Sequence, residues 1–344
     1  VCVPCTAAST GVCDAQLLVC DPASNLCVPC TEHDPCISGA CDTFVGRCFD
    51  PATVVEVGGA GQPTTIAAGL EDLEALWPDA LGERRGMVVL HQRMVDYNER
   101  VIVQDGSLVD TDAQAIRFIA AEGESPSWVY TTVMPEAPIL TVRGATTHAY
   151  LDGITLRANG GLADGWGLRC DNARVEVRRS QVVANVGGGI EALGQCDLHV
   201  ENSFVGGDVN DRDALSVADE GVTATILYST LGAGYGDDIA AALRCPMGAA
   251  VEVRNSLLVA RTTTPEVVCP SFVQASNATE AGGLGSMNVS WFSSYAAGDF
   301  HLSANAPAVI VVADWQTGDP TTDIDGSERV VADQMLDHAG ADVP

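Results

Sequence analysis

The chain has 344 residues, of which 47% are hydrophobic and only 5% aromatic, so its core must be built from Val, Ile, Leu and Ala. Its net charge of −29 excludes nucleic acid and anionic membranes as partners, because the surface repels them. All 17 basic residues are Arg, which excludes a Schiff-base or phosphate-loop lysine. The sequence also contains no apolar run of about 18 residues, so it predicts no membrane span.

Nine of the 13 cysteines lie in the first 48 residues, where two sets of four repeat. CVPCT occurs at residues 2–6 and again at 27–31, and CDPASNLC at 20–27 resembles CDTFVGRC at 41–48. Segments this short cannot bury enough apolar surface to fold alone, so we predict disulfides made in an oxidising compartment. A zinc site is the alternative, but His33 is the only histidine nearby and the cysteine spacing follows the repeat.

Each set of four cysteines allows three disulfide connectivities, of which we favour first-to-third and second-to-fourth. The expected pairs are Cys5–Cys20, Cys13–Cys27, Cys30–Cys41 and Cys36–Cys48. Cys2 remains unpaired, at the place of the last cysteine of an earlier unit. From this place of Cys2 we expect more such units upstream in a precursor; without them Cys2 is a free or intermolecular thiol. The units resemble the short, Dickkopf-N-like cysteine-rich repeats of secreted myxobacterial proteins.

A helix is predicted next, over the segment TTIAAGLEDLEALW at residues 64–77. Its apolar residues Ile66, Leu70 and Leu73, with Leu76 or Trp77, recur at helical spacing and define one face. Strand-like segments follow, MVVLHQRMVDYNERVIVQDGSLV and AIRFIAAEG. We expect the helix to cover the N-terminal end of a stack of strands, because such ends expose apolar side chains and free backbone groups.

Similar strand-like segments then recur along the chain. VEVRRSQVVAN at residues 175–185 is nearly repeated as VEVRNSLLVAR at 251–261. Small residues at the centres of these segments are 27, 23, 26 and 27 residues apart: Gly153, Ser180, Ser203, Ser229 and Ser256. This period predicts a solenoid. The absence of an L-x-x-L-x-L frame excludes leucine-rich repeats and strand alternation excludes helical ones, which leaves a parallel β-helix with the small residues stacked near a turn.

The four later cysteines have the spacing of one coil. Cys170 and Cys196 are 26 residues apart, and Cys245 and Cys269 are 24 apart. Adjacent coils lie about 4.8 Å apart, which suits the Cα separation of a disulfide. We therefore predict the bridges Cys170–Cys196 and Cys245–Cys269 between neighbouring coils, with four buried free thiols as the alternative.

Two C-terminal segments carry a resemblance to a known family. GDFHLSANAPAV (298–309) and TDIDGSERVVADQMLDHAGADV (322–343) are similar to the ending of secreted bacterial parallel β-helix proteins of the pectin-lyase-like family. The segment NAPA replaces the Ser-Pro-Ala element of that ending. The resemblance implies an all-β, right-handed parallel β-helix with an N-terminal capping helix. The expected organisation is disulfide-rich repeats at 1–50, an N-terminal cap at 51–85, coils at 86–312 and a C-terminal cap or tail at 313–344.

Clustered aspartates provide the candidate site. The candidates lie in GGDVNDRDAL and, one coil later, in GYGDDI: Asp208, Asp211, Asp213, Asp237 and Asp238. Several carboxylate oxygens in one loop suit Ca²⁺, the candidate cofactor, whereas ordinary turn chemistry and acid–base catalysis are the alternatives. A second acidic loop, which contains Asp319, Asp323 and Asp325, is expected to act as a structural cap. The scattered histidines His148, His199 and His301 are assigned no role.

These features predict a secreted, non-enzymatic surface or appendage protein. A stalk of disulfide repeats would carry a rigid β-helix used for adhesion, matrix or filament assembly. Its expected partners are further copies of itself, neighbouring surface proteins or a glycan. The alternative is a Ca²⁺-dependent polysaccharide lyase or a glycoside hydrolase that acts on an extracellular glycan.

Overall fold

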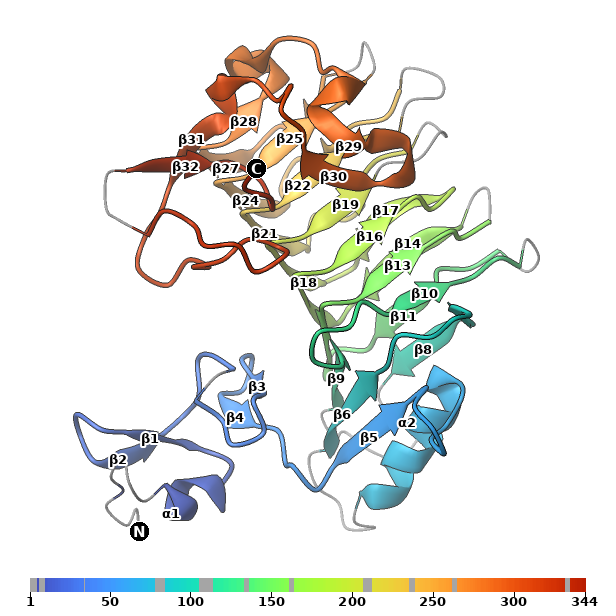
Figure 1. Ribbon diagram of the computed structural model, residues 1–344, viewed down its shortest axis with the longest axis vertical. Helices are drawn as coiled ribbons and strands as arrows, with labels where there is room; N and C mark the ends of the chain where they lie inside the picture. Colours follow the sequence, from blue (N-terminus) through green and yellow to red (C-terminus); the bar gives the residue numbers. More distant parts are fainter. Residues whose placement is uncertain are drawn as a thin grey trace.

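The structure, a computed structural model, describes residues 5, 10–33, 35–77, 84–104, 114–132, 136–160, 164–206, 212–234, 239–261, 265–331 and 335–344. Strands stack into three parallel sheets, which confirms the predicted parallel β-helix (Figure 1). A disulfide-rich segment precedes the stack, and the C-terminal segment folds against its side. Within these ranges, no helix combines the length and the apolar composition needed to cross a bilayer.

Each full coil contributes one strand to each of three sheets, which we number in order along a coil. Sheet 1 contains β8 (Val101–Gln104), β11 (Leu140–Arg143), β14 (Trp166–Asp171), β17 (Gly188–Leu193), β20 (Leu215–Val217), β23 (Leu243–Arg244) and β26 (Val267–Val268). Sheet 2 contains β5 (Val54–Val57), β6 (Arg84–Leu90), β9 (Gln114–Ala120), β12 (Thr147–Asp152), β15 (Arg174–Arg178), β18 (Asp197–Glu201), β21 (Thr223–Leu227), β24 (Ala250–Arg254) and β27 (Phe272–Ala275). Sheet 3 contains β7 (Tyr97–Asn98), β10 (Ser127–Val129), β13 (Thr155–Arg157), β16 (Gln181–Val183), β19 (Phe204–Gly206), β22 (Thr230–Gly232), β25 (Leu257–Val259) and β28 (Ala278–Thr279).

The core consists of apolar columns that run through the stack. In sheet 2, strict register places one inward residue above another: Val177, Val200, Ile226 and Val253. All four side chains are buried, as are their counterparts in sheets 1 and 3. The VEVR motif recurs because β15 and β24 occupy the same position in their coils and each places two valines in the core.

A ladder of serines connects sheets 2 and 3. The hydroxyls of Ser180, Ser203, Ser229 and Ser256 each accept a hydrogen bond from a backbone N–H of the preceding coil, at 3.1–3.3 Å. The residue before each serine has a φ of 45–54°, so the chain turns sharply there. Ile154 occupies the level of Ser180 and Gly153 that of Arg179, one residue from the predicted alignment, because the left-handed turn residue precedes the ladder position.

The predicted capping helix is present as α2 (Ile66–Leu76). The hydroxyl of Thr65 accepts a hydrogen bond from Ala68 N at 3.2 Å and begins the helix. Ile66 and Leu73 are fully buried against β5 and β6, and Trp77 rather than Leu76 completes the apolar face. The helix therefore closes the N-terminal end of the core.

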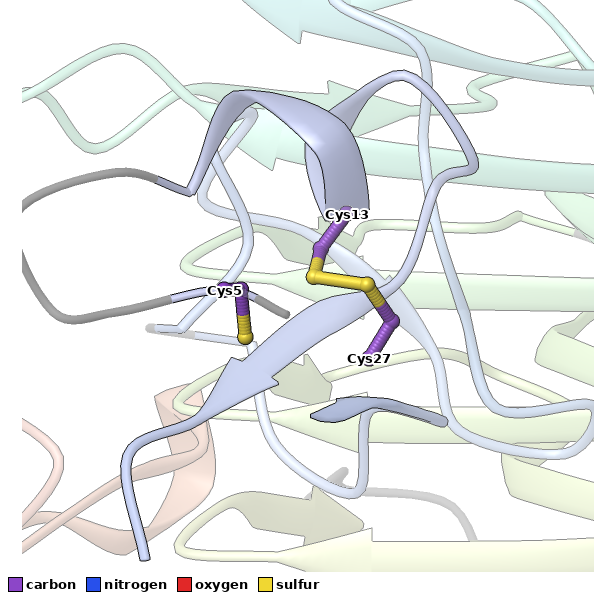
Figure 2. Close-up of side chains that lie close together, drawn as sticks. All are labelled: Cys5, Cys13 and Cys27. Atoms are coloured by element: carbon purple, nitrogen blue, oxygen red, sulfur yellow. A yellow bond between two sulfur atoms is a disulfide. The ribbon is translucent and has the colours of Figure 1, made fainter. Parts of the chain in front are cut away.

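The disulfide-rich segment contains α1 (Gly11–Asp14) and two small hairpins, β1 (Val19–Asp21) with β2 (Leu26–Val28) and β3 (Cys41–Asp42) with β4 (Arg47–Cys48). Its bridges are Cys5–Cys20, Cys13–Cys27, Cys30–Cys41 and Cys36–Cys48. The β-helix contains Cys170–Cys196 and Cys245–Cys269, with Cα separations of 5.8 and 4.6 Å. These are the six predicted pairs, whereas Cys2 lies outside the described residues. Figure 2 shows Cys5 beside the bridge between Cys13 and Cys27.

The stacked strands end at β28, earlier than the expected coil boundary at residue 312. The following segment forms the hairpin of β29 (Phe292–Ser294) and β30 (Asp299–Leu302), and the pair β31 (Val311–Asp314) and β32 (Leu336–His338). Short helical turns connect them: η1 (Glu280–Leu284), η2 (Val289–Trp291), η3 (Tyr295–Ala297) and η4 (Ala308–Ile310). Aromatic residues of this segment pack on outward apolar residues of sheet 3, for example Phe300 on Phe204 at 5.8 Å between ring centroids. The segment leaves the stack because this outer face is apolar and has to be covered from the side.

Candidate functional site

The second cysteine unit lies on the outer face of sheet 2. Asp42, on β3, is fully buried and its carboxylate bonds three side chains of the β-helix. Arg85 Nε lies 2.9 Å away, Tyr150 donates its hydroxyl at 2.5 Å, and His148 Nδ1 lies 3.3 Å away. Burial raises the pKa of Asp42, but the hydrogen bonds from His148 and Tyr150 outweigh it and hold this pKa below its ordinary value. The second cysteine unit is therefore fixed to the sheet.

A second buried contact fixes the same unit. Glu176, the polar residue of the first VEVR motif, accepts a hydrogen bond from Thr43 at 2.9 Å and lies 3.3 Å from His33 Nε2. The backbone N–H of Cys41 donates to His33 Nδ1, so the proton of the neutral ring is on Nε2 and points at Glu176. Phe44 stacks against Tyr150 and His148 between these two polar contacts. The second cysteine unit thus forms a fixed wall on the outer face of sheet 2.

A cleft opens between this wall and the C-terminal segment. It has two adjoining compartments of about 730 and 510 Å³, which share Gly39 of the cysteine unit with Ile119, Asp152 and Arg179 of the β-helix. The first compartment is also lined by Gln181 of β16 and by side chains from the turn after β9 and from the acidic C-terminal loop: Glu122, Glu124, Ser125, Ile324 and Asp325. The second is lined by Glu32, His33, Arg117, Arg178, Glu201, Trp315 and Asp319. Segments from three distant parts of the sequence therefore meet here.

The floor of the cleft is an ion-pair network centred on Asp152. This buried carboxylate accepts a bond from Arg117 Nη2 at 2.5 Å and two bonds from Arg179, at 2.6 and 2.8 Å. Burial raises the pKa of Asp152, but the two guanidinium groups outweigh it and keep the pKa below its ordinary value. Arg179 stands in the left-handed turn before Ser180 and is 52% exposed, so part of its guanidinium faces the cleft.

Glu201 is the second buried carboxylate of the cleft. It accepts hydrogen bonds from Arg178 Nη2 at 2.5 Å and Nε at 2.9 Å, and His199 Nε2 lies 3.5 Å away. Burial raises the pKa of Glu201, but the hydrogen bond from His199 and the charge of Arg178 outweigh it, so the net shift of this pKa is downward. Burial lowers the pKa of His199, but Glu201 and Glu176 reverse this and raise it. Asp152 and Glu201 are thus ionised and paired with arginines.

These shifts predict that stability is highest in a window between about pH 5 and 6. The lowered pKa values of Asp42, Asp152, Glu176 and Glu201 supply stability that is present above their ordinary values of 3.8 and 4.5 and is lost as the pH falls through the folded values. Burial raises the pKa of Glu280 to about 7, so its contribution is present below 4.5 and is lost as the pH rises through 7. Urea unfolding from pH 3 to 9 measures the profile. Asp152→Asn should flatten the acid limb and Glu280→Gln the alkaline limb, and a stability that keeps rising above pH 7 contradicts the prediction.

Of the five predicted metal ligands, only Asp213 is described; Asp208, Asp211, Asp237 and Asp238 lie outside the described residues. The carboxylate of Asp213 is paired with Arg244, at 2.6 Å from Nε and 3.0 Å from Nη2, and accepts a hydrogen bond from Ala241 N at 2.8 Å. Its oxygens therefore already have partners on the chain, and a Ca²⁺ ion would have to displace Arg244.

The second acidic loop contains residues with different surroundings. Asp319 forms a bidentate pair with Arg254 at 2.5 and 2.6 Å. Asp323 accepts hydrogen bonds from three backbone N–H groups, those of Asp325, Ser327 and Val343, and so shapes the loop. The exposed Asp325 points elsewhere, toward His301.

His301, Asp325 and Asp342 form a group that we did not predict. Their ligand-type atoms all lie within 4.8 Å of one another, and His301 Nε2 is 2.9 Å from the nearer oxygen of Asp325. On the other side of the ring, His301 Nδ1 lies 2.5 Å from Asp299. The residues are 24 and 17 positions apart in the sequence, so no local motif brings them together. The DIDG motif identified the loop but not the histidine that it faces.

Two groups of cysteine sulfur atoms also lie close enough to hold a metal: Cys5, Cys13 and Cys27, and Cys30, Cys36 and Cys48. Each of these sulfur atoms is in a disulfide, so none can be a thiolate ligand. These six cysteines therefore stabilise the fold and are not zinc ligands in the oxidised protein.

Residues 1–54 match the model of a family described as "Family of unknown function (DUF8331)". No curated protein matches the chain. Among solved structures, the pectin methylesterase from Aspergillus niger, in deglycosylated form, is similar to this chain with a TM-score of 0.37 and 14% sequence identity. That likeness covers 66% of this chain and 86% of the other. The family match covers the disulfide-rich segment.

Proposed function

We propose that this protein is an extracellular, non-catalytic adhesion protein whose β-helix presents the cleft on sheet 2 to a neutral glycan. The observation that carries the proposal is the cleft itself, a preformed site between a fixed disulfide unit and the C-terminal segment. A site that needs no ordering on binding loses little of its interaction energy to conformational entropy. Six disulfides support an oxidising, extracellular location.

The chemistry of the walls favours a hydroxyl-rich ligand. Arg179 offers a half-exposed guanidinium, and Ser125, Thr155 and Gln181 offer hydroxyl and amide groups around it. Such convergent donors and acceptors suit sugar hydroxyls. The net charge of −29 opposes an anionic polysaccharide, so the ligand class is a neutral glycan.

The pairing of the buried acids favours binding over catalysis. A glycosidase needs one carboxyl group with a raised pKa to act as general acid. In this cleft the buried carboxylates Asp152 and Glu201 have lowered pKa values because guanidinium groups hold them ionised, and the third buried carboxylate, Asp319, is paired with Arg254. These acids are therefore suited to positioning Arg178 and Arg179 for a ligand and not to donating a proton.

The test is a glycan array followed by calorimetry on the intact protein, with Arg179→Gln as the variant. Asp152 keeps its bond to Arg117 in this variant, so the sheet should remain folded. We expect binding without bond cleavage, and at least about tenfold weaker binding by Arg179→Gln, since one charge-assisted hydrogen bond contributes roughly 1.5–3 kcal/mol. Arg174→Gln is the matched control, because Arg174 is an exposed arginine of the same sheet, paired with Asp197 on the strand next to it.

Two results would overturn the proposal. New reducing ends or unsaturated uronate absorbance during incubation would make the protein a polysaccharide hydrolase or lyase. Filaments in electron micrographs together with no binding to any glycan would make self-association, and not ligand recognition, the role of the β-helix.

A further inference from the structure

The group of His301, Asp325 and Asp342 joins three segments of the C-terminal region. His301 lies on β30, Asp325 in the loop after Asp323, and Asp342 near the end of the chain. Asp342 is buried and its carboxylate accepts a hydrogen bond from Leu302 N at 2.5 Å, which places it beside β30. The three side chains meet at a point that none of the three segments defines alone.

The orientation of the imidazole ring is the informative feature. Its Nδ1 is bonded to the carboxylate of Asp299, which fixes the ring and directs Nε2 toward Asp325 and Asp342. A histidine whose other nitrogen is held by a carboxylate is the usual arrangement at metal centres, where the carboxylate sets the tautomer. In addition, Nε2 is buried and makes no hydrogen bond of good geometry in the described residues, although Asp325 is 2.9 Å away.

Several carboxyl groups lie around the imidazole ring of His301. Three carboxyl groups, those of Asp299, Asp325 and Asp342, surround one ring, and a carboxylate only accepts hydrogen bonds. Asp323 lies behind them and adds negative potential at Asp342. A positive charge between Nε2 and the two carboxylates would satisfy all of these atoms, and a metal ion supplies it without the in-line geometry that an N–H bond needs.

We propose that His301 Nε2, Asp325 and Asp342 bind one divalent transition-metal ion, of the Zn²⁺ or Mn²⁺ type, at the rim of the cleft. One imidazole nitrogen and two carboxylates suit these ions, whereas Ca²⁺ takes oxygen ligands only. Ligands of one such ion at about 2.1 Å lie at most about 4.2 Å apart, so the group closes by small side-chain rotations. Asp325 is 59% exposed and also lines the 730 Å³ compartment, so the proposed site adjoins the cleft.

Calorimetry on the EDTA-treated, dialysed protein with ZnCl₂, MnCl₂ and CaCl₂ tests the site without any glycan. We expect one equivalent of Zn²⁺ or Mn²⁺ to bind and Ca²⁺ not to bind. His301→Gln and Asp325→Asn should abolish the binding or weaken it at least tenfold. Asp299→Asn should keep the stoichiometry and weaken the affinity by 10- to 100-fold, because it changes only the residue that orients the ring. His338→Gln is the matched control, since His338 has 29% exposure and an aspartate neighbour at 3.8 Å.

Cobalt substitution gives a second readout. Co²⁺ bound to an imidazole nitrogen produces visible absorption bands, which should be present in the wild type and lost in His301→Gln. Circular dichroism shows whether each variant is folded, and the exposed position of Asp325 makes Asp325→Asn the variant least able to disturb the fold. Absence of binding to the wild type, or equal binding to folded Asp325→Asn, would overturn the proposal. Preferential binding of Ca²⁺ would overturn the assigned class of ion. These outcomes are independent of whether the cleft binds a glycan.

Discussion

Replacing Asp42 with Asn is expected to lower the free energy of unfolding by about 3–5 kcal/mol, the range for breaking one partner of a buried ion pair. The Asp42 carboxylate neutralises Arg85, whose side chain is 5% exposed, and accepts bonds from Tyr150 and His148. Asn has nearly the same shape as Asp but carries no charge, so Arg85 loses the charge of its partner in this network. The amide NH₂ of Asn also donates hydrogen bonds, and here it would meet groups that are themselves donors. The loss in the free energy of unfolding therefore measures the electrostatic contact and not the formation of a cavity.

Equilibrium urea unfolding of the wild type and Asp42→Asn measures this loss. Asp197→Asn is the matched control on the same sheet, because Asp197 is 44% exposed and lies 3.9 Å from Arg174, which is 42% exposed. An exposed pair contributes at most about 1 kcal/mol, so the two variants should differ several-fold. Equal losses would show that the cysteine unit is not held by the buried pair. If unfolding has two steps, the loss should appear in the step that exposes residues 30–48 to protease.

Replacing Arg329 with Gln should release the C-terminal segment from the side of the β-helix. The guanidinium of Arg329 is completely buried and donates to Asn202 Oδ1 at 3.0 Å and to Gly340 O at 2.9 Å. It also pairs with Asp337 at 3.3 Å and lies over the ring of Tyr228 at 4.4 Å. The substitution removes the guanidinium group from Asp337, whose side chain is 1% exposed, so we expect a loss of about 3–5 kcal/mol.

Hydrogen exchange followed by mass spectrometry locates this loss. We expect faster exchange over residues 311–344 with the stacked coils unchanged, since locally attached segments open before the global unfolding. Arg157→Gln is the control, because Arg157 is 47% exposed and pairs with Asp96 at 3.0 Å. Faster exchange spread evenly over all coils would contradict a local role for Arg329. Unchanged exchange would mean that aromatic packing alone holds the segment.

The parts of this structure that follow from local pattern could be predicted from the sequence. The sequence pattern recurs because each coil must place small aliphatic residues in the same narrow core. The repeat period and the one-coil spacing of Cys170 and Cys196 can therefore be recognised in the sequence. The helix α2 is visible for the same reason, through the spacing of Ile66 and Leu73. The predicted serine ladder was wrong by one residue at Gly153. Glycine is as small as the ladder residues, but Gly153 occupies the left-handed position that precedes the ladder.

The candidate sites could not be predicted, because they depend on contacts between distant segments. Asp42 meets His148 across 106 residues, and no pattern in either segment indicates the other. The cleft exists only because the cysteine unit and the C-terminal segment both lie near the same sheet. The proposed metal ligands are likewise brought together by the hairpin of β29 and β30, whose position depends on the apolar outer face of sheet 3.

The attachment of the second cysteine unit has a mechanical consequence. Its contacts reach Arg85 on β6, Arg117 on β9, His148 on β12 and Glu176 on β15, so they extend across four successive coils. A pulling force applied through the N-terminal segment is therefore shared among several coils and loads these contacts together. It does not first peel β5 from the end of the stack. An extracellular protein tethered through this segment would resist tension along the whole length of this contact.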